Sequence, residues 1–123
     1  MTKRVLVIDD DDGVREIIQI SLETVTDWTV WAANSGKSGM AIAQSQPLDL
    51  ILLDVMMPEE DGIAIYKKLQ ADESTRTIPT ILLTAKARPS ERKEFMALGI
   101  DGIITKPFKS KALVENIIQI VGW

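Results

Sequence analysis

Two residue types that often carry catalysis or bind metals are missing from this chain of 123 residues, which has neither cysteine nor histidine. Without cysteine, the chain cannot form disulfides, thiolate zinc sites or a cysteine nucleophile. Without histidine, it cannot build a His-based catalytic triad, and it cannot carry a phosphohistidine of its own. Its chemistry is therefore left to groups such as carboxylates, hydroxyls and amines.

The chain also lacks long runs of positive charge and long hydrophobic runs. Its 14 Lys and Arg are outnumbered by 18 Asp and Glu, and its formal net charge is −4. Because nucleic-acid binding depends on basic patches, we expect no direct contact with nucleic acid. The first stretch, MTKRVLVIDDDD, turns acidic too soon for a signal peptide or a membrane span. We therefore expect a cytoplasmic protein without a membrane partner.

Short apolar runs alternate with helical patterns along the whole chain, which is typical of a repeated βα unit with a parallel sheet. The expected strands are Arg4–Asp9, Trp28–Ala33, Leu50–Leu53, Pro79–Thr84 and Asp101–Thr105. The first expected helix has one apolar face, with Val14, Ile17, Ile18, Ser21, Leu22 and Val25. The other expected helices run from the cap Ser35 to about Gln44, over Ile63–Gln70, from Pro89 to Gly99, and over Ser110–Val121 before Gly122.

These units predict an α/β fold with a single doubly wound (βα)5 domain over residues 1–123. The nearly continuous apolar strands indicate that helices cover both faces of the sheet. We expect the strand order 2-1-3-4-5 of flavodoxin-like folds.

Polar groups follow four of the expected strands. Asp9 and Asp10 follow the first strand, and Asp54, Thr84 and Lys106 follow or end the third, fourth and fifth. Since ligands bind at the carboxyl ends of the strands in open α/β sheets, we expect these groups to form one site. Oxygen ligands without histidine or cysteine favour Mg²⁺ or Mn²⁺ over zinc. The aspartate after the third strand can act as a nucleophile toward phosphorus, and the lysine and threonine can contact a phosphoryl group.

Four motifs follow one another along the chain: VLVIDD with Arg15 downstream, LLDVMMPEEDG, ILLTA and Lys106–Phe108. In their order and spacing the chain resembles, over its whole length, a receiver domain of two-component response regulators, a CheY-like protein. We interpret Asp11 and Asp12 as helix caps rather than ligands. The resemblance implies a cis peptide between Lys106 and Pro107. It also implies roles for the strand-end residues: Asp54 as phosphoacceptor, Asp10 and Asp9 as Mg²⁺ ligands (Asp9 directly or through water), the Met56 carbonyl as a further ligand, Thr84 as a switch hydroxyl and Lys106 as a phosphate contact.

The chain departs from the receiver pattern at Ile103, where many receivers carry an aromatic residue that rotates together with the switch hydroxyl. We therefore expect the phosphorylation chemistry without the usual aromatic form of the switch. Met56 and Lys86 lie where the family tunes the lifetime of the phosphoryl group. Because Met56 has no polar group to orient water, we expect slow hydrolysis.

The resemblance implies a phosphoacceptor switch that catalyses only its own phosphorylation and dephosphorylation. A sensor histidine kinase or a histidine phosphotransfer protein would supply the phosphoryl group. We expect a stand-alone receiver, monomeric or weakly dimeric, that signals by protein contact or onward phosphotransfer. The surface over Pro89–Gly99, Asp101–Thr105 and Ser110–Val121 would meet the target, although Val114 and Ile118 can equally widen a core face.

Two other classes of protein fit the residues less well. Aspartate-based phosphohydrolases typically carry a second aspartate two residues after the nucleophile, and this chain has Met56 there. A flavodoxin-type FMN carrier needs a phosphate loop after the first strand, where Asp9–Asp12 would repel a phosphate.

Overall fold

The computed structural model describes residues 2–58, 60–85 and 88–123 and shows five parallel strands in the order β2-β1-β3-β4-β5. The predicted fold class and strand order are thereby confirmed. The strands are β1 (Arg4–Ile8), β2 (Thr29–Ala33), β3 (Leu50–Asp54), β4 (Thr80–Thr84) and β5 (Gly102–Thr105). The helices are α1 (Asp12–Val25), α2 (Gly36–Ser45), α3 (Gly62–Ala71), α4 (Pro89–Ala97) and α5 (Ser110–Val121), within one or two residues of the predicted bounds.

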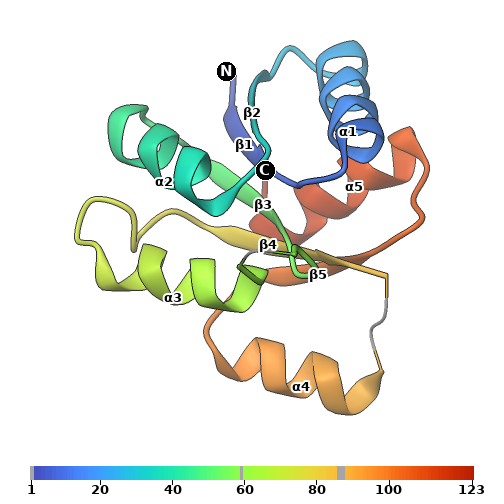
Figure 1. Cartoon of the computed structure of the whole chain (residues 1–123). Coiled ribbons are helices and arrows are strands. Elements are labelled where there is room, and N and C mark those ends of the chain that lie inside the picture. Colours follow the sequence, from blue (N-terminus) through green and yellow to red (C-terminus); the bar gives the residue numbers. More distant parts are fainter. Residues whose placement is uncertain (1, 59, 86–87) are drawn as a thin grey trace.

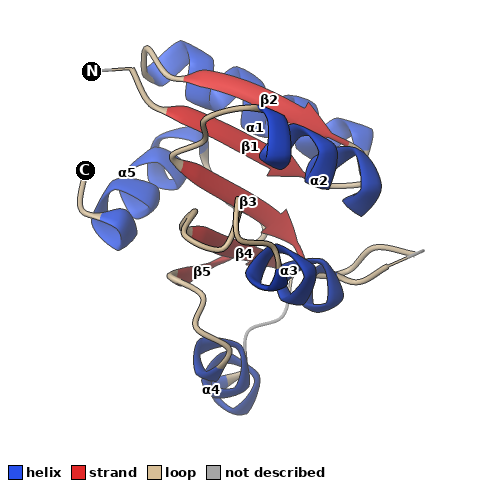
Figure 2. Ribbon diagram, turned by 90° about the vertical axis from the view of Figure 1, so that its left-hand side faces the viewer, coloured by secondary structure: helices blue, strands red, loops and turns tan. Residues whose placement is uncertain are grey.

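Helices cover both faces of the sheet, because successive side chains of each strand point to opposite sides. Val5 and Val7 of β1 belong to one hydrophobic cluster, together with residues of α1 and α5. Leu6 and Ile8 belong to a second cluster with residues of α2 and α3. The two layers of helices are visible on either side of the sheet in Figure 1, and Figure 2 shows the strands running in the same direction. This arrangement brings the carboxyl ends of all five strands to one edge.

The predicted apolar face of α1 is partly wrong. Ile18 and Leu22 are fully buried, but the side chains of Ile17 and Val25 are 55% and 50% exposed. Ile17 is one helical step away from Ile18 and therefore lies at the side of the buried stripe. Val25 is the last residue of the helix, where the chain turns toward β2. The helical period predicts the direction of the core, whereas the width of the buried stripe depends on the neighbouring elements.

Local capping explains where several helices begin and end. The carboxylate of Asp11 accepts a hydrogen bond from the Val14 N–H at 3.0 Å, which confirms it as the cap of α1. Ser35 accepts from the Ser38 N–H in the same way at the start of α2. Gly122 ends α5 with φ of 77°, a left-handed conformation that glycine adopts without steric cost. These short-range signals place the helices that frame the carboxyl edge of the sheet.

The helix α4 packs more loosely than the others, since none of its nine residues, all of them described, is buried. Phe95 is its one side chain that packs, half-buried, against the cluster containing Ile103 of β5. On α5, Val114 is buried and belongs to the core, while Ile118 is 37% exposed. The two residues predicted to widen the face of α5 thus separate into one core residue and one surface residue. Among the described residues, no helix has the length and apolar character that crossing a membrane requires.

Candidate functional site

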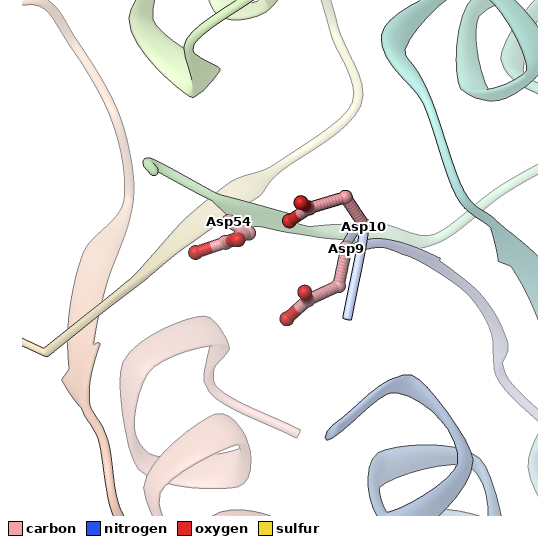
Figure 3. Close-up of side chains that lie close together, drawn as sticks. All are labelled: Asp9, Asp10 and Asp54. Carbon is pink, nitrogen blue, oxygen red and sulfur yellow. The ribbon is translucent and has the colours of Figure 1, made fainter. Parts of the chain in front are cut away.

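Strand pairing brings the predicted acidic residues together. Ile8 of β1 pairs with Leu53 of β3, so that Asp9 and Asp54 leave the sheet side by side. Figure 3 shows the side chains of Asp9 and Asp10 extending from the end of β1 toward Asp54. One carboxylate oxygen of each of the three residues lies within 4.8 Å of the others. The structure therefore forms the acidic cluster that the strand ends predict.

The lysine after β5 reaches into this cluster. In β4 and β5, Thr84 pairs with Thr105, and the Lys106 N–H donates to the Thr84 carbonyl at 2.8 Å. The Lys106 ammonium Nζ then donates to Asp9 Oδ2 at 2.9 Å and to Asp54 Oδ1 at 3.1 Å. One cation thus bridges two carboxylates that come from different strands. The three carboxylates and one ammonium leave the site with an excess of negative charge.

Burial differs sharply among the acidic residues. Asp9 is fully buried and Asp54 is 4% exposed, whereas Asp10 is exposed. The carboxylate of Asp9 also accepts a hydrogen bond from the Asp11 N–H at 3.0 Å. Asp54 Oδ1 lies 3.4 Å from the Met56 N–H, the outer limit of hydrogen-bonding distance. Two of the acids are therefore fixed by the protein, and the third faces solvent at the mouth of the site.

Burial raises the pKa of Asp54 from 3.8 to about 6, and the nearby charge of Asp9 adds to this effect. Lys106 opposes both effects without cancelling them. Burial would lower the pKa of Lys106 itself, but its hydrogen bonds and charge interactions with Asp9 and Asp54 outweigh burial and raise that pKa. The single ammonium of Lys106 therefore does not offset burial and the charge of Asp9, and a further cation bound there would favour the ionised form of Asp54.

A pocket of about 310 Å³ opens over the cluster. It is lined by Asp10, Asp11, Asp54, Met56, Ala85 and Lys106. Carboxylate oxygens, a nearby main chain and an ammonium make up its polar wall, and such oxygen donors suit a hard divalent cation such as Mg²⁺. The pocket also leaves room beside the carboxylates for a phosphoryl group, because one water in the liquid occupies only about 30 Å³.

Most of the predicted site residues meet at this pocket. Thr84 is buried, 4% exposed, at the end of β4, next to Ala85 in the pocket wall. Met56 is exposed on the loop after β3. Ile103 is 8% exposed and faces the cluster on the α3 side of the sheet. The peptide between Lys106 and Pro107 is cis, as the resemblance implied. Lys86 lies outside the described residues.

Sequence reasoning assigned no role to Arg15 beyond its place in a motif. In the structure its guanidinium donates from Nη1 to the backbone carbonyl of Asp9 at 2.9 Å and also contacts the carboxylate of Asp12. The available signal was its position in the first turns of the helix that directly follows the acidic run. That position brings an arginine back over the end of β1.

The comparisons with known proteins agree with this site. Residues 5–118 match the family model described as the response regulator receiver domain. The chain belongs to this family. Receiver domains are phosphoacceptor switches of two-component systems, and they bind Mg²⁺ at an acidic site. The predicted family is therefore confirmed.

The similar proteins include regulators with a further segment. The phosphate regulon transcriptional regulatory protein PhoB of Pseudomonas aeruginosa is 37% identical over 94% of this chain, and the DNA-binding dual master transcriptional regulator RpaA of Synechocystis is 34% identical over 93%. The match covers 50% and 47% of these relatives, so the chain spans about half of their length. The expectation that nucleic acid is not a partner gains no support from relatives with such names.

Solved structures show the same fold at nearly full length. The chemotaxis protein CheY4 of Vibrio cholerae has a TM-score of 0.90 at 27% identity, with 98% of this chain and 99% of that chain covered. The receiver domain of the sensor histidine kinase PA1611 of Pseudomonas aeruginosa has a TM-score of 0.86 at 26% identity, and both chains are covered completely. That structure is described as having a magnesium ion coordinated in the active site cleft.

Proposed function

We propose that Asp54 accepts a phosphoryl group from a phosphohistidine donor in a Mg²⁺-dependent reaction. The observation that carries this proposal is the setting of Asp54 at the end of β3. Its carboxylate is buried, lies 3.1 Å from the Lys106 ammonium, and borders a pocket shared with Asp10. The proposed role follows from this geometry together with the family to which the chain belongs.

In the proposed reaction, a carboxylate oxygen of Asp54 forms a bond to phosphorus and gives an acyl phosphate. The bond between phosphorus and the imidazole nitrogen of the donor breaks, and its electron pair leaves with the imidazole. The described contacts of Asp54 with Lys106 and Met56 both engage Oδ1, so Oδ2 is the candidate attacking oxygen. Lys106 stabilises negative charge on the transferring group from a fixed position, which is the main way proteins assist phosphoryl transfer.

We further propose that Asp9, Asp10, Asp54 and the Met56 carbonyl hold Mg²⁺, with Mn²⁺ as a substitute. The donor set fits the ion, because three carboxylate oxygens lie within 4.8 Å of one another and one of the residues is exposed at the pocket mouth. When bound, the ion neutralises negative charge on the incoming phosphoryl group. The solved receiver described with a coordinated magnesium ion supports this assignment. Thr84 completes the proposed site as the switch hydroxyl.

An apolar pocket beside the acidic one suggests where the donor protein docks. Its volume is about 340 Å³, and it is lined by Val14, Ile17, Ala85, Lys106, Pro107 and Phe108. It shares Ala85 and Lys106 with the acidic pocket, so an apolar helix seated here would lie next to Asp54. We propose the phosphodonor, a histidine kinase or histidine phosphotransfer protein, as the occupant. A phosphoryl group must enter from this edge to reach the buried carboxylate.

The output surface is proposed to lie over α4, β5 and α5. Exposed apolar side chains gather on its helices, namely Met96 with 48% exposure and Ile118 with 37%. We propose that residues 1–123 act as one stand-alone receiver, monomeric or weakly dimeric, whose only catalysis is its own phosphorylation and dephosphorylation. The signal would leave by contact of this surface with a target protein or by onward phosphotransfer.

The experiment that tests the proposal is intact-mass analysis after incubation with acetyl phosphate, with Mg²⁺ or with EDTA. The wild-type chain is compared with Asp54→Asn, and Asp61→Asn serves as a control because Asp61 caps α3 outside the acidic cluster. Inorganic phosphate is measured in the same samples, since a short-lived acyl phosphate would appear there. We expect one Mg²⁺-dependent phosphoryl adduct in the wild type and the control but not in Asp54→Asn. If neither adduct nor phosphate release depends on Asp54, the proposal fails.

A further inference from the structure

The Arg15 side chain fixes a part of the backbone that the acidic cluster depends on. Its guanidinium donates from Nη1 to the Asp9 carbonyl at 2.9 Å, while Nη2 contacts the exposed carboxylate of Asp12. The Arg15 side chain is only 19% exposed, so the contact with the carbonyl is largely shielded from water. The planar guanidinium holds two acceptors at once, which a lysine ammonium does not do with the same geometry.

The contact with Arg15 completes a set of restraints on Asp9. The Asp9 N–H donates to the Ala33 carbonyl at 3.1 Å, and its carboxylate accepts from Asp11 and Lys106 at 3.0 and 2.9 Å. The Asp9 carbonyl is the remaining polar group of this residue, and Arg15 binds it. Every polar group of Asp9 is therefore held by another part of the protein.

Fixing this carbonyl has a direct effect on Asp10. The carbonyl of Asp9 belongs to the same planar peptide unit as the N–H of Asp10, because the peptide bond does not rotate freely. Holding the plane fixes the N–Cα bond of Asp10 and so narrows the directions in which its side chain can leave the backbone. Figure 3 shows the Asp10 side chain directed toward Asp54. Asp10 is exposed, so burial does not hold its side chain in this position.

We propose that Arg15 is a positioning residue for the cation site: by fixing the peptide between Asp9 and Asp10, it pre-orients the Asp10 carboxylate for a divalent cation. This inference rests on the proposed Mg²⁺ site. Residues that orient metal ligands through hydrogen bonds typically change metal affinity by roughly 10- to 100-fold when they are replaced. Because Arg15 acts through the backbone, we expect an effect near the lower end of that range.

The charge of Arg15 predicts a change in Mg²⁺ affinity opposite to the one that its positioning role predicts, so one measurement distinguishes the two effects. Arg15 carries positive charge close to a site for a cation. If charge alone mattered, its removal would strengthen Mg²⁺ binding, because like charges repel. If positioning matters more, its removal weakens binding. The direction of the change therefore separates the two effects.

The experiment measures the Mg²⁺ dissociation constant by titration calorimetry on the unphosphorylated protein, for the wild type, Arg15→Met, Arg15→Lys and Asp12→Asn. We expect Mg²⁺ binding to weaken about tenfold in Arg15→Met and by a smaller factor in Arg15→Lys, which keeps the positive charge but loses the planar guanidinium that binds two acceptors. Asp12→Asn removes the exposed ion pair and keeps the contact with Asp9, so its affinity should stay within roughly twofold, since exposed pairs contribute little. The rate with acetyl phosphate at saturating Mg²⁺ should stay near the wild-type value in Asp12→Asn.

The outcomes are distinct. If the wild type binds no Mg²⁺, the proposed metal site fails and the role of Arg15 fails with it. If the wild type binds Mg²⁺ and the two Arg15 variants bind it equally well or more tightly, only the positioning role is overturned. If Arg15→Met does not fold, Arg15→Lys carries the test. If neither variant folds, Arg15 is required for folding in general, and the specific role proposed here is overturned.

Discussion

Replacing Asp54 by asparagine should stabilise the metal-free protein at neutral pH. Asparagine has nearly the shape of the neutral carboxyl group and does not ionise. Burial and the charge of Asp9 raise the pKa of Asp54 from 3.8 to about 6, so the ionised form is disfavoured in the folded state. At 1.36 kcal/mol for each pKa unit, this rise corresponds to roughly 3 kcal/mol. This value already includes the opposing attraction of Lys106, and asparagine matches the neutral carboxyl group only approximately, so we expect a net gain of about 1–3 kcal/mol at pH 7.5.

The gain in stability of Asp54→Asn over the wild type should increase with pH. A group whose pKa is raised by folding contributes stability that is fully present below its unfolded pKa and is lost as the pH rises through the folded value. The wild type should therefore lose stability relative to Asp54→Asn between about pH 4 and 6, with a plateau above that range. Near pH 4 the two proteins should differ little.

Urea unfolding in EDTA at several pH values from about 4 to 8 measures this difference. Asp27→Asn is the matched control, because Asp27 is exposed. Saturating Mg²⁺ should shrink this gain in stability, since an ion bound at the proposed wild-type site would stabilise the folded state of the wild type. The reasoning is refuted if Asp54→Asn is no more stable than the wild type at pH 7.5, or if its gain is the same at all pH values.

Three further predictions concern neighbouring positions. Lys106→Met should raise the pKa of Asp54 further, because it removes the cation that opposes the effect of burial. It should also slow phosphorylation by acetyl phosphate by roughly a hundredfold, as measured by intact mass. An unchanged rate would contradict the proposed role of the ammonium. Gly62→Ala should lower the free energy of unfolding in urea by about 1–3 kcal/mol, because a Cβ there would lie 2.3 Å from the Asp54 carbonyl oxygen. A stability equal to that of the wild type would show that the loop moves away easily. Ile17→Glu should slow phosphoryl transfer from a phosphorylated histidine phosphotransfer protein but not from acetyl phosphate. Val25→Glu, at a similarly exposed position at the far end of the same helix, should change neither transfer rate. Equal effects of the two variants would contradict the proposed docking pocket.

The core of the site could be predicted from sequence because parallel strands end at one edge. Asp9, Asp54 and Lys106 each follow a short apolar run, and the period and length of those runs identify them as buried strands. Once the strands are parallel and adjacent, the residues that follow them meet without any further information. The acidic cluster and its ammonium are thus a consequence of topology.

Other features depend on side-chain packing that no periodic pattern encodes. The exposure of Ile17 depends on how far the loop around Phe108 reaches over α1, and both residues line one pocket. The contact of Arg15 with the Asp9 carbonyl requires a particular side-chain conformation and a particular turn after β1. The pKa of Asp54 depends on the balance between burial and a lysine that lies 52 residues away in the chain. Such features follow from distances between elements, and the sequence constrains these only weakly.

The loose packing of α4 indicates where the proposed phosphorylation would have its largest structural effect. A phosphoryl group on Asp54 would replace the single negative charge of the carboxylate by nearly two at the end of β3, and Lys106, now shared between two carboxylates, is the cation available to meet them. Lys106 directly follows β5, so a shift of its side chain acts on that strand first. Ile104 of β5 packs into the cluster that contains three buried residues of α5, whereas Ile103 meets a cluster to which α4 contributes only the half-buried Phe95. Because fewer contacts hold α4, it can change position at lower free-energy cost than α5. We therefore expect the proposed output surface to respond to phosphorylation chiefly through α4, even with an isoleucine at position 103.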